Sequence, residues 1–137
     1  GSDSIAIQEI AATDFEEYRE VNELILQGRK LGSDVLIAEA TDSKCYDTVV
    51  ISKAADAMLA MSGIEASFVL AKNTQGFISI SARSRSKLNV QRIMEELGGG
   101  GHFNLAAAQI KDLTLSEAGE KLTEIVLNEI KEKEKEE

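Results

Sequence analysis

The sequence predicts an α/β fold in which a small mixed β-sheet is flanked by helices. Short apolar runs with strand character alternate along the chain with segments whose apolar residues recur at helical spacing. The chain has 137 residues, of which 43% are hydrophobic, and this is enough for one domain with its own core. Proline is absent and no internal repeat is visible, so no domain boundary is indicated.

The first predicted elements are a helix and a buried strand. The residues from Thr13 to Glu16 have the spacing of a capping box, and apolar positions at helical spacing follow to about Leu31. The sequence Gly-Ser-Asp at 32–34 ends this helix, and the apolar run Val35–Ala38 predicts a short strand. We expect residues 1–2, Gly-Ser, to be a cloning scar.

A second helix and a β-hairpin are predicted next. Asp47 can cap a helix whose apolar stripe runs from Val50 to Leu59. The continuous apolar run Ala66–Ala71 predicts a central strand, and the sequence Asn-Thr-Gln-Gly at 73–76 predicts a hairpin turn. Residues 76–84 alternate apolar side chains with serines and an arginine, so we expect one face of this strand to be core and the other polar.

A third helix leads into a glycine-rich segment. Asn89 can cap this helix, and Gly98 ends it. The small apolar run Phe103–Ala108 predicts a short helix that starts just after His102, and residues 109–111 predict a short edge strand.

The last predicted element is a long amphipathic helix. Residues Thr114–Glu117 have capping-box spacing, and the apolar stripe that follows continues to about Ile130. Residues 131–137 carry mixed charge, and we expect this tail to fray.

Charge and residue usage limit the classes of function. The net charge of -9 disfavours binding to long nucleic acid. One Cys (Cys45) and one His exclude an internal disulfide and argue against a buried zinc site, which fits a reducing, cytoplasmic compartment. The 24 acidic residues leave a magnesium or manganese site open on composition, although they form no obvious ligand cluster. No apolar stretch reaches the roughly 18–20 residues that span a membrane.

The cations are unevenly distributed along this acidic chain. The stretch from Ala66 to Met94 contains no Asp or Glu, and it carries Lys72, Arg83, Arg85, Lys87 and Arg92. This pattern favours a local positive site for a small anion, and the alternative is chance clustering on a solvated face.

The most informative motif is the run of four glycines, 98–101, followed by the single histidine, His102. Such a run is costly in backbone entropy, so it indicates a place where the backbone bends sharply or comes very close to a ligand. Backbone amides of a glycine loop can bind phosphate oxygens, and a strand-end arginine can bind the same anion through two hydrogen bonds. The candidate site therefore comprises Ser81, Arg83, Ser84, Asn89, Gly99, Gly100, Gly101 and His102.

Each of these residues also has a structural interpretation. The glycines can form a flexible loop, Asn89 can act only as a helix N-cap, and His102 can cap the element that follows it. Arg83 and Ser84 can lie on a solvated strand edge. The combination favours a phosphate site more than any single residue does.

The order and spacing of these motifs resemble the DHHA1 domain, which is the C-terminal, substrate-binding half of DHH-family phosphoesterases. The resemblance rests on Ser81-Ala82-Arg83-Ser84, Asn89-Val90-Gln91 and the segment 98–107, Gly-Gly-Gly-Gly-His-Phe-Asn-Leu-Ala-Ala. It covers the chain from about Asn22 onward, with 32–130 as the domain and 3–31 as a segment leading in from the catalytic half. The four glycines, and Ala108 in place of a glycine after Ala106-Ala107, make the chain most similar to cyclic-di-AMP phosphodiesterases of the GdpP type.

The resemblance implies a role for each motif residue. Arg83 and Ser84 would contact a phosphate, the amides of Gly99, Gly100 and Gly101 would approach the ligand, and His102 would lie near the scissile bond. Ser81 and Asn89 match the motif with less defined contacts. The family's catalytic half carries an Asp-His-His motif and holds two Mn²⁺, and a chain with one histidine lacks that motif.

This sequence is therefore expected to bind and position cyclic-di-AMP or its product pApA, without hydrolysing either alone. We expect it to be a cytoplasmic domain of a membrane-anchored parent, without direct membrane contact, and to work with its own DHH catalytic domain. One alternative is a substrate-binding domain of a nanoRNase or RecJ-like exonuclease acting on short single strands. A second is a non-catalytic dimerisation module.

Overall fold

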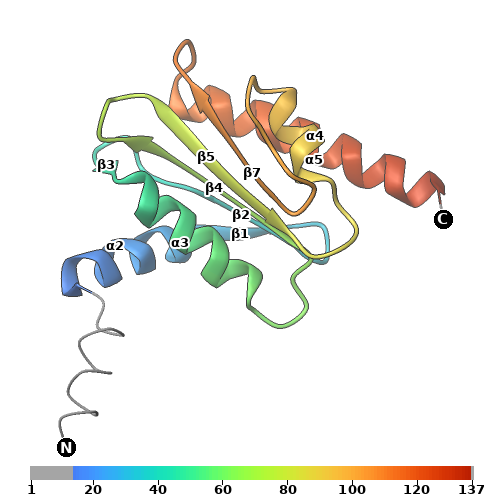
Figure 1. Cartoon of the computed structure of the whole chain (residues 1–137), viewed down its shortest axis with the longest axis horizontal. Helices are drawn as coiled ribbons and strands as arrows, with labels where there is room; N and C mark the ends of the chain where they lie inside the picture. The colour runs from blue at the N-terminus through green and yellow to red at the C-terminus, as the bar shows by residue number, and fades with distance from the viewer. Residues whose placement is uncertain (1–13, 137) are drawn as a thin grey trace, which may run out of the picture.

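A computed structural model describes residues 14–136 of the chain. It confirms the predicted α/β class: seven strands form one mixed sheet, with helices on both faces (Figure 1). The helices are α2 (Phe15–Leu26), α3 (Thr48–Leu59), α4 (Val90–Glu95) and α5 (Leu115–Glu136). The strands are β1 (Gly28–Leu31), β2 (Val35–Glu39), β3 (Cys45–Tyr46), β4 (Ala66–Asn73), β5 (Ile78–Ser84), β6 (Gly100–Gly101) and β7 (Leu105–Ile110).

The strand order is β1-β2-β4-β5-β7-β6, and β3 pairs with the far end of β4. Strands β2 and β4 are parallel and are connected through α3, whereas the β4–β5, β5–β7 and β6–β7 pairs are antiparallel. Strand β4 lies at the centre of the sheet, and this explains its nearly continuous burial on both faces.

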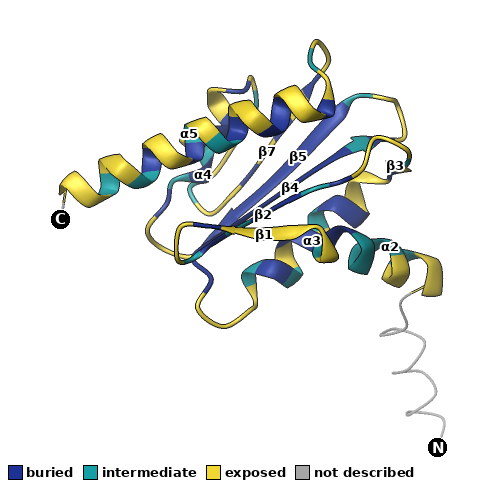
Figure 2. Ribbon diagram, turned by 180° about the vertical axis from the view of Figure 1, so that it is seen from behind, coloured by how far each residue is buried: buried dark blue, intermediate teal, exposed yellow. Residues whose placement is uncertain are grey.

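Two helical layers enclose the sheet. Helices α2 and α3 lie on one face, and α4 and α5 lie on the other (Figures 1 and 2). The Ser67 hydroxyl of β4 donates to the Ala55 carbonyl of α3 at 2.7 Å, and this ties the first layer to the sheet. Figure 2 shows α5 with its buried residues toward the sheet and its exposed residues outward, as its predicted amphipathic pattern requires.

The predicted helix caps are confirmed where the structure describes them. Asp47 and Asn89 each accept a hydrogen bond from a backbone amide in the first turn of the helix that follows. Asp14, which was not predicted as a cap, does the same for α2. Thr114 and Glu117 form a reciprocal capping box: the Thr114 amide donates to Glu117 at 2.9 Å, and the Glu117 amide donates to the Thr114 hydroxyl at 3.1 Å. The first predicted capping box begins at Thr13, which lies outside the described residues.

The prediction of one helix to about Leu31 is wrong. Helix α2 ends at Leu26, and β1 follows and pairs antiparallel with β2. An ideal Cβ at Gly28 would lie 2.9 Å from the Ile25 carbonyl oxygen, so a glycine suits the sharp change from helix to strand. Strand β3, which has only two residues, was also absent from the prediction.

The prediction of a short helix at Phe103–Ala108 is also wrong. Residues 105–110 form β7, and its side chains alternate between exposed and buried. Alanine favours helices, but here the backbone pairs on both sides, with β5 and with the glycine residues of β6, and this pairing overrides the propensity. The expected edge strand at 109–111 is the end of β7, and α5 continues to Glu136, past its predicted end at Ile130. None of the helices among residues 14–136 has the length and apolarity needed to cross a membrane.

Candidate functional site

The predicted site lies on the face of the sheet that carries α3, where the cover of that helix ends. Alternate residues of β5 point to this face and are buried, with 5–8% of their surface exposed, because α3 packs over them. Their partners on β7 are exposed. The register pairs Ser79 with Gln109, Ser81 with Ala107 and Arg83 with Leu105. The predicted polar face of β5 is therefore real, but it is covered, and the accessible surface belongs to β7.

Arg83 is held in place by α3. Its Nε donates to Oδ1 of Asp56 at 2.7 Å, and its Nη1 donates to the Ala82 carbonyl at 3.0 Å. The Arg83 side chain is 10% exposed, whereas that of Asp56 is 62% exposed. The interpretation of Arg83 as a solvated edge residue is thus wrong. A guanidinium has five N–H donors, and these two bonds leave others that can bind an anion at the open side.

The glycine run forms an ordered strand edge instead of a flexible loop. Gly98 has φ of 84° and ends α4, and the Gly99 amide donates to the Met94 carbonyl at 2.8 Å. Gly100 and Gly101 then pair with Ala107 and Ala106 of β7.

Two of these glycines leave no room for a side chain. An ideal Cβ at Gly99 would lie 2.1 Å from the Ala107 carbonyl oxygen, and one at Gly101 would lie 2.5 Å from the Leu105 carbonyl oxygen. Nothing lies within 4 Å of the corresponding position at Gly100. At Gly99 and Gly101, the close approach that the sequence indicated is therefore one between the glycine backbone and the backbone of the 105–108 segment.

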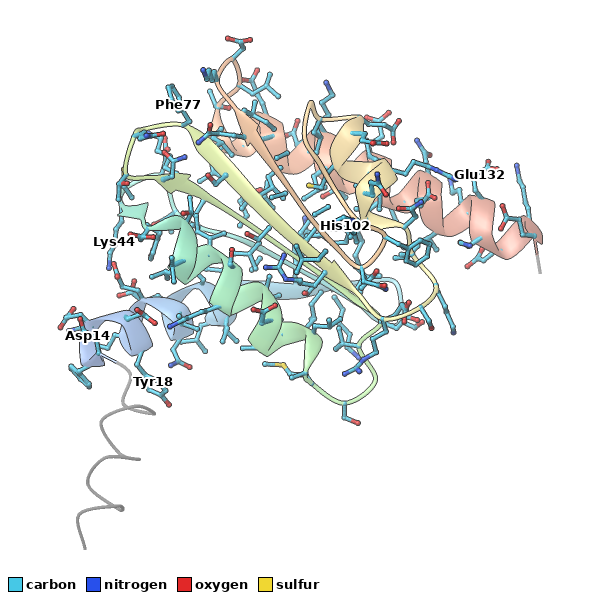
Figure 3. All side chains as sticks on the ribbon, in the orientation of Figure 1. Asp14, Tyr18, Lys44, Phe77, His102 and Glu132 are labelled. Atoms are coloured by element: carbon cyan, nitrogen blue, oxygen red, sulfur yellow. The ribbon has the colours of Figure 1, made fainter. Side chains whose placement is uncertain are left out.

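His102 closes the hairpin between β6 and β7 and is exposed. Its amide donates to the Leu105 carbonyl at 2.7 Å, and Leu105 in turn pairs with Arg83 across the β7–β5 boundary. Two strand spacings separate the backbones of His102 and Arg83, which is about 10 Å. Figure 3 shows His102 on the segment beside β7, between that strand and α4. The fold thus brings the two residues to the same end of β7.

Ser84 is bonded to this turn, whereas Asn89 caps α4. The Ser84 hydroxyl donates to the Phe103 carbonyl at 3.2 Å, and its amide donates to the Asn104 carbonyl at 3.0 Å. The Asn89 side chain accepts from the Arg92 amide at 3.2 Å, which makes it a true helix N-cap. Ser84 is also buried, so the solvated-edge interpretation does not hold for it either. In this structure both residues have structural partners.

Two residues near the site were missed by the sequence analysis. Asp56 binds Arg83, and the Ser52 hydroxyl lies 3.2 Å from the Ser81 hydroxyl. Both belong to α3 and are four residues apart, so they lie on the same side of the helix. The sequence did contain a signal for these two residues, since they are polar residues at helical spacing in a largely apolar helix. A helix with such a polar side can pack over the polar residues at alternate positions of β5.

Another cluster of titratable groups lies away from the site, between α2 and the segment before α3. The Glu23 carboxylate accepts from the Lys44 ammonium at 3.0 Å and from the Tyr46 hydroxyl at 2.9 Å. These two hydrogen bonds, Lys44 first, lower the pKa of Glu23. Burial, with the bond to Glu23 as the next cause, raises the pKa of Tyr46 to about 12. This cluster ties the first helix to the sheet.

Within residues 14–136, no group of three or more His, Cys, Asp or Glu side chains is placed to hold a metal ion. On this face, the groups that can bind an anion are the guanidinium of Arg83 and the imidazole of His102.

Comparison with known proteins identifies the class. A model of the DHHA1 domain matches residues 32–133, which is most of the chain, so the chain belongs to the DHHA1 domain family. The resemblance inferred from the motifs is thereby confirmed.

The relatives define a narrower group within the family. The chain is 39% identical over 126 residues to the cyclic-di-AMP phosphodiesterase GdpP of Geobacillus thermodenitrificans, covering 92% of this chain and 19% of that protein. It is 39% identical over 122 residues to the cyclic-di-AMP phosphodiesterase PdeA of Listeria monocytogenes, covering 89% of this chain and 19% of that protein. The chain thus spans about a fifth of the length of these relatives.

Solved structures support the fold. An exopolyphosphatase-related protein from Bacteroides fragilis matches with a TM-score of 0.70 at 18% identity, covering 90% of this chain and 38% of that one. The pGpG-specific phosphodiesterase PggH from Vibrio matches with a TM-score of 0.56 at 16% identity, covering 82% of this chain and 39% of that one. At these identities the likeness concerns the fold alone.

Proposed function

We propose that this chain is the substrate-binding domain of a cyclic-di-AMP phosphodiesterase, and that it binds a phosphate of cyclic-di-AMP or pApA at Arg83 and His102. Hydrolysis would belong to a DHH domain outside this sequence, where two Mn²⁺ ions are expected. The domain's own contribution would be to hold the dinucleotide in one position, which can lower a reaction barrier by several kcal/mol. A cytoplasmic location within a membrane-anchored parent is part of the same proposal.

The observation that carries the proposal is that Arg83 is buried and its guanidinium is held by Asp56. A buried guanidinium, oriented by Asp56 at the edge of an exposed strand, is preorganised to bind an anion with little further loss of side-chain entropy. His102, at the same end of β7, can donate to the same anion. The 39% identity to two cyclic-di-AMP phosphodiesterases over most of this chain favours a cyclic dinucleotide as the ligand.

Calorimetric titration tests the proposal. The chain would be titrated with cyclic-di-AMP, pApA and a short oligoribonucleotide, each against the Arg83→Ala and His102→Ala variants. Loss of one charge-assisted hydrogen bond should weaken dinucleotide binding by about 1–3 kcal/mol, a factor of roughly 5 to 150. Lys121→Ala, at an exposed position on α5 across the sheet, is the matched control and should bind like the parent chain.

The outcomes separate the substrates as well as the site. Unchanged dinucleotide affinity in both variants, with thermal stability intact, would refute the assignment of Arg83 and His102. Preferential binding of the oligoribonucleotide would favour the second candidate, a domain for short single strands. That candidate is motivated by the 40% identity over 68 residues to the bifunctional oligoribonuclease and PAP phosphatase NrnA of Thermus thermophilus, which covers half of this chain and 21% of that protein.

A further inference from the structure

His102 lies beyond the last residue pair that joins β7 to β5. The register between these strands ends where Leu105 pairs with Arg83, and Leu105 comes three residues after His102 along the chain. The strand ladder between β5 and β7 therefore does not fix the turn 102–105 against the strand that carries Arg83. If His102 and Arg83 are to reach one anion together, contacts beyond the end of this ladder have to hold the turn in place.

The side chain of Asn104 makes such contacts. Its Nδ2 donates to the Ser84 carbonyl at 3.1 Å and also to the Arg85 carbonyl, so both donors of the amide are used. The backbone carbonyl of Asn104 accepts from the Ser84 amide at 3.0 Å. One exposed residue thus both donates to and accepts from the segment that directly follows Arg83.

The segment that Asn104 holds is itself fixed to α3. The Arg85 guanidinium donates to the carbonyl of Leu59, the last residue of α3, at 2.8 Å. Arg83 is held to the same helix by the hydrogen bond described above. Helix α3 is therefore a common reference for both parts of the site. It holds Arg83 directly, and it holds the turn 102–105 through Arg85 and Asn104.

The turn has two further hydrogen bonds that do not involve the Asn104 side chain. The Ser84 hydroxyl and the Val90 amide both donate to the Phe103 carbonyl, at 3.2 Å and 3.0 Å. These bonds would remain if the amide of Asn104 were removed. We therefore expect its loss to loosen the turn without unfolding the domain.

We propose that Asn104 is a positioning residue whose side-chain amide fixes the turn at His102 relative to Arg83, so that both can bind one phosphate. The inference rests on the proposed function and deepens it by adding a residue that acts through His102. The physical gain is preorganisation, because a turn that is already held in place loses little conformational entropy when the ligand binds.

NMR relaxation of the whole chain tests the positioning without any ligand. In Asn104→Ala, the backbone order parameters of His102 and Phe103 should fall from about 0.85 toward about 0.6, while those of β5 keep their values. Because His102 is the only histidine of the chain, selective labelling of histidine reports on it alone. Asn104→Ser keeps one donor, so its effect should be smaller. Gln109→Ala removes another exposed amide from β7 and is the matched control, with no change expected.

A double-mutant cycle tests whether Asn104 acts through His102, with the affinity for pApA measured by calorimetry. Asn104→Ala should weaken binding about three- to tenfold in the parent chain. In the His102→Ala background the same substitution should have little further effect, because the group that it positions is already absent. A purely structural contribution of Asn104 would weaken binding equally in both backgrounds.

The outcomes distinguish this inference from the proposed function. Unchanged order parameters in Asn104→Ala, or an equal loss of affinity in both backgrounds, would overturn the positioning role. If His102→Ala weakens pApA binding and Asn104→Ala does not, the phosphate site stands and the positioning role fails. If neither His102→Ala nor Arg83→Ala weakens binding, the proposed function itself fails. Should Asn104→Ala not fold, Asn104→Ser takes its place in both measurements.

Discussion

Two neighbouring glycines of the same run should respond to alanine in opposite ways. At Gly99 the added Cβ would lie 2.1 Å from the Ala107 carbonyl oxygen and 2.7 Å from Ala108 Cα, both of them backbone atoms. An ordinary contact is 3.4–4 Å. The glycine segment would therefore have to move away from β7 by about 1 Å or more, since backbone cannot be relieved by a change of rotamer. Overpacking of this kind costs about 1–3 kcal/mol.

At Gly100 the same substitution meets no atom within 4 Å, and its φ is not in the left-handed region. Alanine there restricts the unfolded chain without straining the folded one, which stabilises by about 0.4–1 kcal/mol. For a chain of this length, 1 kcal/mol corresponds to roughly 3–5 °C in Tm. We expect Gly99→Ala to lower Tm by about 3–15 °C and Gly100→Ala to leave it unchanged or raise it slightly.

Thermal unfolding followed by circular dichroism measures both values, and titration with the dinucleotide shows whether the displaced strand also disturbs His102. An equal fall in Tm for both variants would mean that the run behaves as a uniform loop. No fall for Gly99→Ala would mean that β6 is not packed against β7. Either result would refute the backbone-to-backbone argument.

Other predictions concern the charged pairs. Asp56→Asn keeps an acceptor for Arg83 Nε but removes the negative charge that competes with the ligand. We therefore expect dinucleotide binding, measured by calorimetry, to strengthen about three- to tenfold. Weaker binding would mean that the charge of Asp56 itself orients Arg83. The lowered pKa of Glu23 means that its contribution to stability is present above about pH 4.5 and is lost as pH falls through the lower folded-state pKa. Urea unfolding should therefore show Glu23→Gln less stable than the parent at pH 7, with the difference shrinking toward pH 3, and a difference independent of pH would contradict the pairing with Lys44. Tyr46→Phe removes only the second of the two hydrogen bonds that lower the pKa of Glu23. The pH-dependent part of its loss of stability should therefore be smaller than that of Glu23→Gln.

Much of the fold could be predicted because its signals are local. Helix caps depend on one side chain and the amides two or three residues away, and Asp47, Asn89 and Thr114 all act as expected. The alternation along β5 and the continuous apolar run of β4 follow from the two-residue period of a strand. The glycine run likewise indicated a close approach, because only glycine allows one.

The candidate site was predicted as a set of residues but not as an arrangement. Arg83, Ser84 and His102 were singled out from the sequence, whereas the partner of Arg83 was not, because Asp56 lies 27 residues earlier and on a different element. The role of Ser84, which holds the turn through the Phe103 carbonyl, also follows only from the hydrogen bonds of the folded chain.

The sequence by itself therefore determined the α/β class, the helix starts and the residues that identify the family. The tertiary structure decided which secondary structure the ambiguous segments adopt. Leu105–Ile110 is rich in alanine and has a helix former's composition, yet it became a strand because β5 and β6 offer it pairing on both sides. It also decided that Arg83 is buried, because α3 packs over β5 but not over β7. Pairing and burial depend on contacts between distant segments, and no local pattern in the sequence encodes them.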